Sequence, residues 1–212
     1  MFQCIIFDLS EVLIAGLVGI EEELAQELSM PEDEILSCFA GSLRDELFVG
    51  GISEDTYLKQ IITRERWEID IARLKTVIRN NFHNEVEGSL HILMDLASRY
   101  ELVLLSDHAR EWVSYIQSTY PFLKVFEQTF FSYNLKRTKK DPEAFSRVLD
   151  ALSLSPHHCL FIDDNPKNVH VAEWVGIPSI QFVSAEQLAT DLESRKVLYS
   201  MSWRDQNDPG AF

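Results

Sequence analysis

The sequence predicts an α/β protein with a doubly wound, mostly parallel sheet and an inserted α-helical cap. Short apolar runs at 2–7, 102–105, 159–162 and 178–183 have the length and composition of buried strands. Apolar residues with helical spacing fill much of the sequence between these runs. Buried strands that alternate with helices form parallel βαβ units, and ligands of such sheets lie beyond the carboxyl ends of the strands.

Three helices of the sheet domain have recognisable sequence signals. The first lies before the run at 102–105 and is indicated by the spacing of Leu90, Leu93, Met94 and Ala97. Asp141 followed by Pro142 is typical of a helix N-cap with proline in the first turn. Asn165 and Pro166 predict the start of another helix, which should end near Gly176.

The interval 15–85 contains helix signals and no convincing strand. Ser53 followed by two acidic residues predicts a helix start, and residues 29–33 predict another. An interval of this length is too long to be a loop. We therefore expect a helical cap over 15–85, hinged near Gly16 and 84–88. Its aromatic residues Phe39, Phe48 and Trp67 are expected in the interior of the cap.

The rest of the chain is expected to form one core from two separate pieces of sequence. These pieces are 1–14 and 86–200, and a C-terminal tail follows at 201–212. A chain of 212 residues suits one such domain with an insertion.

Charge and cysteine content limit the partners and the compartment. The net charge is −15, with 34 acidic against 19 basic residues, which argues against nucleic acid and anionic membranes as partners. Cys4, Cys38 and Cys159 are far apart and form no CxxC pair, so we expect reduced thiols and a cytoplasmic protein. The chain shows no signal peptide, and no apolar run approaches the ~20 residues of a membrane span. Oligomeric state is left open by the sequence.

Polar residues follow three of the predicted strands. They are Asp8, the pair Ser106 and Asp107, and the pair Asp163 and Asp164. Parallel strands bring their carboxyl ends to one edge of the sheet, so we expect these side chains in one crevice. Carboxylates can act as a nucleophile or hold a divalent cation, typically Mg²⁺. With a serine hydroxyl and a nearby lysine, this set is suited to phosphoryl transfer.

Four motifs in this order resemble the haloacid dehalogenase-like (HAD) hydrolase superfamily. They are IIFDLSEVL, VLLSDH, TKKDPEAF and LFIDDNPKN, and the resemblance spans about residues 2–185. Most members of that superfamily are Mg²⁺-dependent phosphatases with a Rossmann-like core. The chain is most similar to short-capped phosphatases related to sugar-phosphate phosphatases and to the N-terminal domain of soluble epoxide hydrolase. The resemblance implies Mg²⁺-dependent hydrolysis of a small phosphate ester through an aspartyl-phosphate.

The same resemblance implies catalytic and phosphate-binding roles for individual residues. Asp8 matches the nucleophile, and Ser106 matches the phosphate-binding residue of the second motif, with Asp107 beside it in the same site. Lys139 matches the lysine of the third motif when TKKDPEAF is aligned with the common KPDPxxF form. Lys140 is a competing candidate for that position.

The implied metal ligands are Asp8, the backbone carbonyl of Ser10, Asp164 and the neighbouring Asp163. Asn168 stands where a further aspartate often occurs in the family. A zinc site at His157, His158 and Cys159 is disfavoured, because adjacent histidines point in different directions.

Ser10 departs from the family pattern at a catalytic position. Typical phosphatases of this family have an aspartate there, which protonates the leaving group and later activates water. A positioned acid or base contributes about 10²–10⁴-fold to the rate. Three outcomes stay open: a slow enzyme or one restricted to good leaving groups, a substitute acid among Glu11, Asp107 and His108, or a catalytically impaired binding or regulatory protein. A dehalogenase is disfavoured, because that branch has tyrosine at this position.

Overall fold

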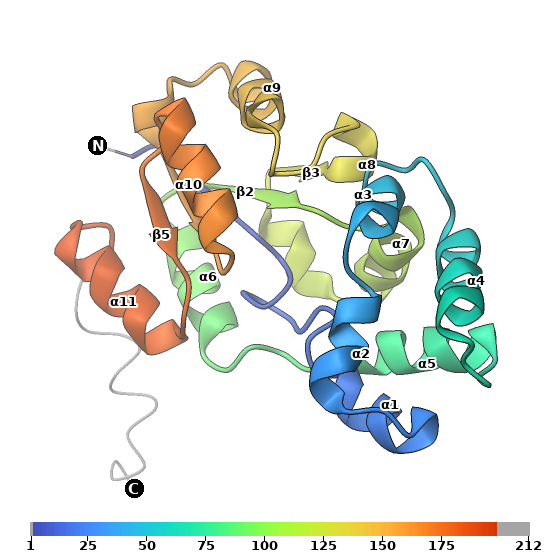
Figure 1. Cartoon of the computed structure of the whole chain (residues 1–212). Coiled ribbons are helices and arrows are strands. Elements are labelled where there is room, and N and C mark those ends of the chain that lie inside the picture. Colours follow the sequence, from blue (N-terminus) through green and yellow to red (C-terminus); the bar gives the residue numbers. More distant parts are fainter. Residues whose placement is uncertain (1, 199–212) are drawn as a thin grey trace, which may run out of the picture.

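The structure, a computed structural model, describes residues 2–198 (Figure 1). Its five-stranded sheet is parallel throughout and has the order β3-β2-β1-β4-β5. The strands are β1 (Cys4–Phe7), β2 (Glu101–Ser106), β3 (Gln128–Phe131), β4 (Cys159–Asp163) and β5 (Ser179–Gln181). The α/β fold with a parallel, doubly wound sheet is therefore confirmed. The predicted tail at 201–212 lies outside the described residues.

Four of the five strands coincide with predicted runs, whereas β3 was not predicted. It is an edge strand of four residues, and only Phe131 among them is buried. The strand follows a short 3₁₀ helix, η1 (Pro121–Val125). An edge strand with one buried residue has no continuous apolar run, so the pattern used for the other strands could not detect it.

The register of the sheet determines which residues meet at its carboxyl edge. Phe7 of the central strand pairs with Leu104 on one side and with Ile162 on the other. Asp8 and Asp163 therefore follow a pair of aligned residues on neighbouring strands. Ser106 is two residues beyond Leu104, at the same edge of the sheet.

Helices cover both faces of the sheet (Figure 1). On one face, Ile5 and Phe7 pack with α6 (Ser89–Ala97), α7 (Arg110–Thr119) and α11 (Ala185–Ser194). On the other face, Cys4 and Ile6 pack with α9 (Pro142–Leu152) and α10 (Pro166–Val175). Alternate residues of one strand thus face opposite layers, and burial of each large apolar side chain contributes about 1.5–3 kcal/mol. The remaining short elements here are α8 (Ser132–Leu135) and η2 (Pro156–His158).

The buried face of α6 differs from the predicted one. Its buried residues are Ser89, Ile92, Leu93 and Leu96, whereas Met94 is 54% exposed and Ala97 is exposed. The helix is apolar around most of its circumference, so periodicity alone did not determine which stripe faces the sheet. The packing of α6 against β2 and α11 determines which of its faces is buried.

The predicted ends of two core helices are confirmed. The side chain of Asp141 accepts a hydrogen bond from the backbone N–H of Glu143 at the start of α9. Asn165 does the same for Lys167 at the start of α10. Gly176 ends α10 with φ of 97°, a conformation that glycine adopts without steric cost.

Five helices occupy the interval in which the sequence predicted only helices. They are α1 (Ile20–Leu28), α2 (Glu32–Cys38), α3 (Ser42–Phe48), α4 (Glu54–Glu65) and α5 (Ile71–Asn81). In Figure 1 they gather to one side of the sheet, coloured from blue to teal. Ser53 caps α4, as predicted, by accepting a hydrogen bond from Thr56 N–H. The division at 15 and 85 into cap and core stays a prediction.

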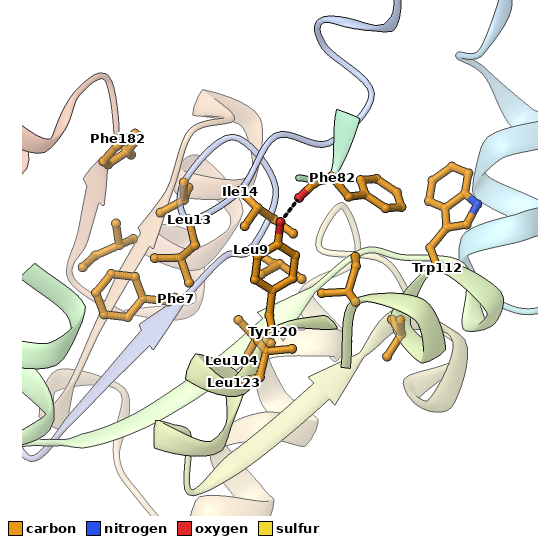
Figure 2. Packing of buried hydrophobic residues seen from close by; sticks show 14 of the residues in the cluster. Phe7, Leu9, Leu13, Ile14, Phe82, Leu104, Trp112, Tyr120, Leu123 and Phe182 are labelled. Carbon is orange, nitrogen blue, oxygen red and sulfur yellow. Dashed lines mark hydrogen bonds between the residues drawn. The ribbon is translucent and has the colours of Figure 1, made fainter. Parts of the chain in front are cut away.

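The two connections to these helices run next to each other. Ala15 N–H donates to the carbonyl of Asn84 over 2.7 Å, and Val86 N–H donates to that of Leu13 over 3.0 Å. Apolar side chains then continue from the sheet into the helices (Figure 2). Tyr120 donates its hydroxyl hydrogen bond to the carbonyl of Phe82, which ties the core to the end of α5.

A buried charge network also joins the helices to the core. Glu54 at the start of α4 accepts two hydrogen bonds of 2.7 Å from the guanidinium of Arg79 on α5. The indole N–H of Trp112 on α7 donates to the same carboxylate over 2.6 Å. The Glu54 side chain is only 2% exposed, so its charge depends on these partners.

We expect Arg79→Met to lower the free energy of unfolding by about 3 kcal/mol, because it leaves Glu54 buried without its main cation. Urea titration followed by circular dichroism measures this change. The matched control is Arg73→Met, since Arg73 pairs with Glu23 and Glu27 at the surface and its loss should cost less than about 1 kcal/mol. Equal losses for the two variants would contradict a structural role for the buried network.

Candidate active site

Lys139 lies at the centre of the acidic cluster. Its Nζ is 2.7 Å from Asp8 Oδ2 and 2.6 Å from Asp163 Oδ2, and its side chain is 2% exposed. Lys140, the competing candidate, is 51% exposed and pairs with Asp45. In the chain segment before α9, the Lys139 side chain thus lies at the edge of the sheet, whereas the Lys140 side chain points to the surface.

The charges of this cluster are coupled. Burial by itself lowers the pKa of Lys139, but the carboxylates of Asp163 and Asp8 raise it above its ordinary value. Lys139 is therefore a permanent cation. Burial raises the pKa of Asp8 and raises that of Asp163 to about 6, while Lys139 opposes both shifts. One cation does not balance all the acids gathered here, which leaves room for a further positive charge.

Three carboxylates offer a place for that charge. Oxygen atoms of Asp8, Asp163 and Asp164 all lie within 4.8 Å of one another. Such a set of hard oxygen donors fits Mg²⁺. Asp163 is already held by Asn165 N–H at 2.8 Å and by the amide of Asn168 at 3.1 and 3.2 Å. Of these three acids, Asp8 and Asp164 also line the cavity described below, and Asp163 does not.

The second motif supplies two different kinds of side chain. Ser106 ends β2, is buried, and its hydroxyl has no hydrogen-bond partner among residues 2–198. An unpaired buried hydroxyl is available to a ligand. Asp107 instead accepts hydrogen bonds of 3.1 and 3.0 Å from the backbone N–H of Lys139, and burial raises its pKa to about 6. The Asp107 carboxyl group therefore positions the lysine backbone. It also lines the cavity described below, and its contact with phosphate stays a prediction.

Ser10, the departure from the family pattern, contacts one of the three candidate substitutes. Its Oγ is 2.9 Å from Nε2 of His108. The His108 ring is buried, packs edge-on against Phe82 and Trp112, and has no partner at Nδ1 within residues 2–198. Burial lowers the pKa of His108 to about 3, so the imidazole is neutral. The serine is thus connected to a base that holds no extra proton.

Glu11 organises the loop that carries Ser10. Its backbone has φ of 60°, and its Oε1 accepts hydrogen bonds from Gly16 N–H at 2.8 Å and Val18 N–H at 3.3 Å. Burial raises the pKa of this carboxyl group. A Cβ at Gly16 would lie 2.8 Å from the Ser10 side chain, so only glycine allows the turn to approach so closely. Glu11 acts here as an acceptor for backbone donors of the loop.

Most of these residues line a cavity of about 220 Å³, whereas Ser106 and Asp163 are not among its lining residues. The lining residues from the sheet domain include Asp8, Ser10, Asp107 and Asp164 near the strand ends, Lys139 before α9 and Asn168 on α10. Arg44 and Phe48 of α3 contribute from the helical segment, and Trp112 contributes from α7. Phe48 is half-buried and lines the cavity, so it is not confined to the helical interior as predicted. Arg44 and Trp112 were not anticipated, since an arginine and a tryptophan on amphipathic helices carry no distinguishing signal.

The disfavoured zinc site is not formed within residues 2–198. Cys159 is buried in β4 and pairs in register with Cys4 of the neighbouring strand. The rings of His157 and His158 lie 4.2 Å apart outside the strand. The acidic cluster is the one group in this part of the chain with metal-binding geometry. Over the same residues, no helix is long and apolar enough to cross a membrane.

Two curated proteins resemble this chain in sequence. Flavin mononucleotide hydrolase 1 of Arabidopsis thaliana chloroplasts is 25% identical over 189 residues, which cover 89% of this chain and 75% of that protein. D-ribitol-5-phosphate phosphatase of Bacteroides thetaiotaomicron is 27% identical over 143 residues, which cover 64% of this chain and 69% of that protein.

Solved structures share the fold at lower sequence identity. A HAD family enzyme of Bacteroides thetaiotaomicron has a TM-score of 0.74 and 20% identity, and the match covers 90% of this chain and 98% of that one. Its complex with magnesium and inorganic phosphate gives a TM-score of 0.71 at 19% identity, covering 87% and 96%. A HAD-like hydrolase of Porphyromonas gingivalis gives 0.74 at 18% identity, covering 94% and 100%.

A family model described as haloacid dehalogenase-like hydrolase matches residues 5–182. This match covers most of the chain and includes all four motifs and the whole sheet apart from Cys4, the first residue of β1. The chain belongs to the haloacid dehalogenase-like hydrolase family.

Proposed function

We propose that this protein is a Mg²⁺-dependent phosphomonoester hydrolase that acts on a small phosphorylated metabolite through an aspartyl-phosphate. The observation that supports it best is the position of Lys139 between Asp8 and Asp163, next to Asp164 and beneath a cavity. A carboxylate nucleophile, a cation and further oxygen ligands are the parts that phosphoryl transfer requires.

In the first step, the carboxylate of Asp8 attacks phosphorus and forms an acyl phosphate, and the substrate oxygen leaves and takes up a proton. In the second step, water attacks phosphorus, which releases inorganic phosphate and restores the carboxylate. Lys139 and the free hydroxyl of Ser106 bind the phosphoryl oxygens. Asp8, the Ser10 carbonyl and Asp164, with Asp163 in support, would hold Mg²⁺, which would neutralise charge on the phosphate.

Ser10 limits the first step, because the leaving oxygen has no strong acid beside it. The Ser10 hydroxyl is hydrogen-bonded to the neutral imidazole of His108. This imidazole can orient the hydroxyl but cannot donate a proton to the leaving group at neutral pH. If Nε2 carries the imidazole hydrogen, it donates to Ser10 Oγ, and the serine O–H is then free to donate to the leaving oxygen. Such a hydrogen bond favours substrates whose leaving groups need little protonation.

The named relatives support the class of reaction. The Arabidopsis protein is named for hydrolysis of flavin mononucleotide and the Bacteroides protein for dephosphorylation of D-ribitol 5-phosphate. Both named substrates are phosphomonoesters of primary alcohols. A related fold binds magnesium together with inorganic phosphate. A cytoplasmic location and the absence of nucleic-acid or membrane partners stay predictions.

Ser10 also favours a second function, a catalytically impaired binding or regulatory protein. Such a protein would keep the fold, the ion and the cavity and lack turnover. The complete set of Asp8, Ser106, Lys139 and Asp164 favours the enzyme. Magnesium binding without hydrolysis of any ester in a broad panel would identify the binding protein instead.

We expect Asp8→Asn to lower kcat for p-nitrophenyl phosphate by more than about 10³-fold, because loss of a nucleophile removes the covalent route. Asp55→Asn makes the same chemical change at an exposed ion pair with Lys75 and should leave kcat unchanged. Undiminished activity of the Asp8 variant would reject the nucleophile assignment.

We expect Ser10→Asp to raise turnover of alkyl phosphates by up to about 10²-fold, because it restores a general acid beside the leaving oxygen. Turnover of p-nitrophenyl phosphate should change little, since its leaving group needs no protonation. Ser10→Ala serves as the control that removes the hydroxyl without adding an acid. No gain on alkyl phosphates would show that another group, such as Glu11, already supplies the proton.

We expect Mg²⁺ at 100 times its dissociation constant to raise the free energy of unfolding by about 2.7 kcal/mol, because the ion binds only the folded site. Asp164→Asn should abolish this gain, whereas Asp55→Asn should retain it. Denaturation curves with and without Mg²⁺ give the measurement, and EDTA should remove turnover in parallel. Equal stabilisation of both variants would place the ion elsewhere.

A further inference from the structure

We propose that Arg44 binds a second anionic group, a carboxylate or a phosphate, on the leaving part of the substrate. The proposal rests on the proposed function and narrows it to phosphomonoesters that carry another negative charge. Arg44 lies on α3 and lines the same cavity as Asp8 and Lys139.

Arg44 lacks an anionic partner in the part of the chain that the structure describes. Its Nε is buried and has no hydrogen-bond partner, and the guanidinium takes part in no ion pair within residues 2–198. The guanidinium carbon lies 5.8 Å from the centre of the Phe48 ring. An unpaired arginine is notable in a chain with 34 acidic and 19 basic residues. A buried N–H without an acceptor is destabilising until a ligand or water supplies one.

The other two cations that line the cavity are already paired. Lys139 contacts Asp8 and Asp163, and Lys140 contacts both oxygens of Asp45. Asp45, the acidic neighbour of Arg44 in sequence, is thereby neutralised and offers less repulsion to an incoming anion. Among the cavity cations of the described residues, Arg44 is the one whose charge is uncompensated.

Arg44 and the phosphoryl site come from different elements that line one cavity. The phosphoryl-binding side chains come from the ends of β1 and β2 and from Lys139, whereas Arg44 comes from the inserted helices. A phosphate ester bound at Asp8 would extend its leaving group toward the helical wall of the cavity. The planar guanidinium binds a carboxylate or a phosphate through paired N–H groups, which suits a second anion at that wall.

Matched substrates test the proposal. In the first pair, 3-phosphoglycerate has a carboxylate where glycerol 3-phosphate has a hydroxymethyl group. In the second pair, 1,3-propanediol bisphosphate has a second phosphate that propyl phosphate lacks. We expect kcat/KM to favour the member with the second anion by about 10- to 100-fold in at least one pair, the range typical of charge-assisted hydrogen bonds. The pair that shows the preference identifies the anion as carboxylate or phosphate.

Variants assign the preference to Arg44. Arg44→Gln should reduce the ratio within the responsive pair to less than about threefold, and Arg44→Lys should retain part of it because the charge remains. Arg73→Gln removes a cation from surface pairs on the same helical segment and should retain the full ratio. General damage to the fold lowers kcat/KM for both substrates of a pair to the same extent. The ratio of the two kcat/KM values therefore reports recognition of the second anion alone. An unchanged ratio in Arg44→Gln, or no preference in the unmodified protein, would overturn the proposal.

A binding measurement separates this proposal from the proposed catalysis. Calorimetry of the Asp8→Asn protein with Mg²⁺ gives dissociation constants for the same pairs without hydrolysis. Tighter binding of the doubly anionic member, lost in Asp8→Asn/Arg44→Gln, supports the role of Arg44 even if the unmodified protein hydrolyses no ester. Equal binding of both members, or binding of neither, contradicts it.

Discussion

The contact of Lys139 with Asp8 and Asp163 is the interaction on which the site depends. It places a buried cation between two carboxylates that would otherwise repel one another at the ends of adjacent strands. Breaking such a pair leaves an uncompensated charge in the interior. The surrounding contacts support this arrangement, because Asp107 accepts hydrogen bonds from the backbone N–H of Lys139 and Asn168 donates to both carboxylate oxygens of Asp163.

A second constraint is the tight turn that follows β1. Glu11 adopts a left-handed conformation and accepts backbone hydrogen bonds from Gly16 and Val18, which returns the chain toward Ser10. The turn brings Ser10 against His108 of the neighbouring strand end. A position that holds an acid in most of the family thus holds a neutral hydrogen-bonded pair here. Under the proposed function, Asp8 and Lys139 would still bind and attack phosphate, while Ser10 would supply no strong acid to the leaving group.

The helical segment α1–α5 contributes residues of α3 to the other wall of the cavity. Buried polar contacts connect this segment to the sheet domain. Glu54 receives hydrogen bonds from Arg79 within the segment and from Trp112 of the core, so one carboxylate joins both parts. Trp112 and Phe48 then pack against each other at the cavity. The two sides of the cavity differ, because Asp8, Asp164 and Lys139 line it from the sheet domain, whereas Arg44, Asp45 and Phe48 line it from α3.

The sequence by itself determined four of the five strands, several helix ends and the identity of the acidic cluster. Buried runs followed by Asp8, Ser106 and Asp163 were sufficient, because parallel strands bring their carboxyl ends to one edge. The sequence did not predict edge strand β3, because only one of its residues is buried and it has no continuous apolar run. It also did not predict which face of α6 is buried, because that helix is apolar around most of its circumference.

Only the tertiary structure decided which of two adjacent lysines turns inward, that the Asp107 carboxyl group holds a backbone N–H, and that Arg44 faces the cavity unpaired. These outcomes depend on contacts between residues far apart in the chain. Local sequence patterns carry no information about such contacts, whereas packing in three dimensions fixes them.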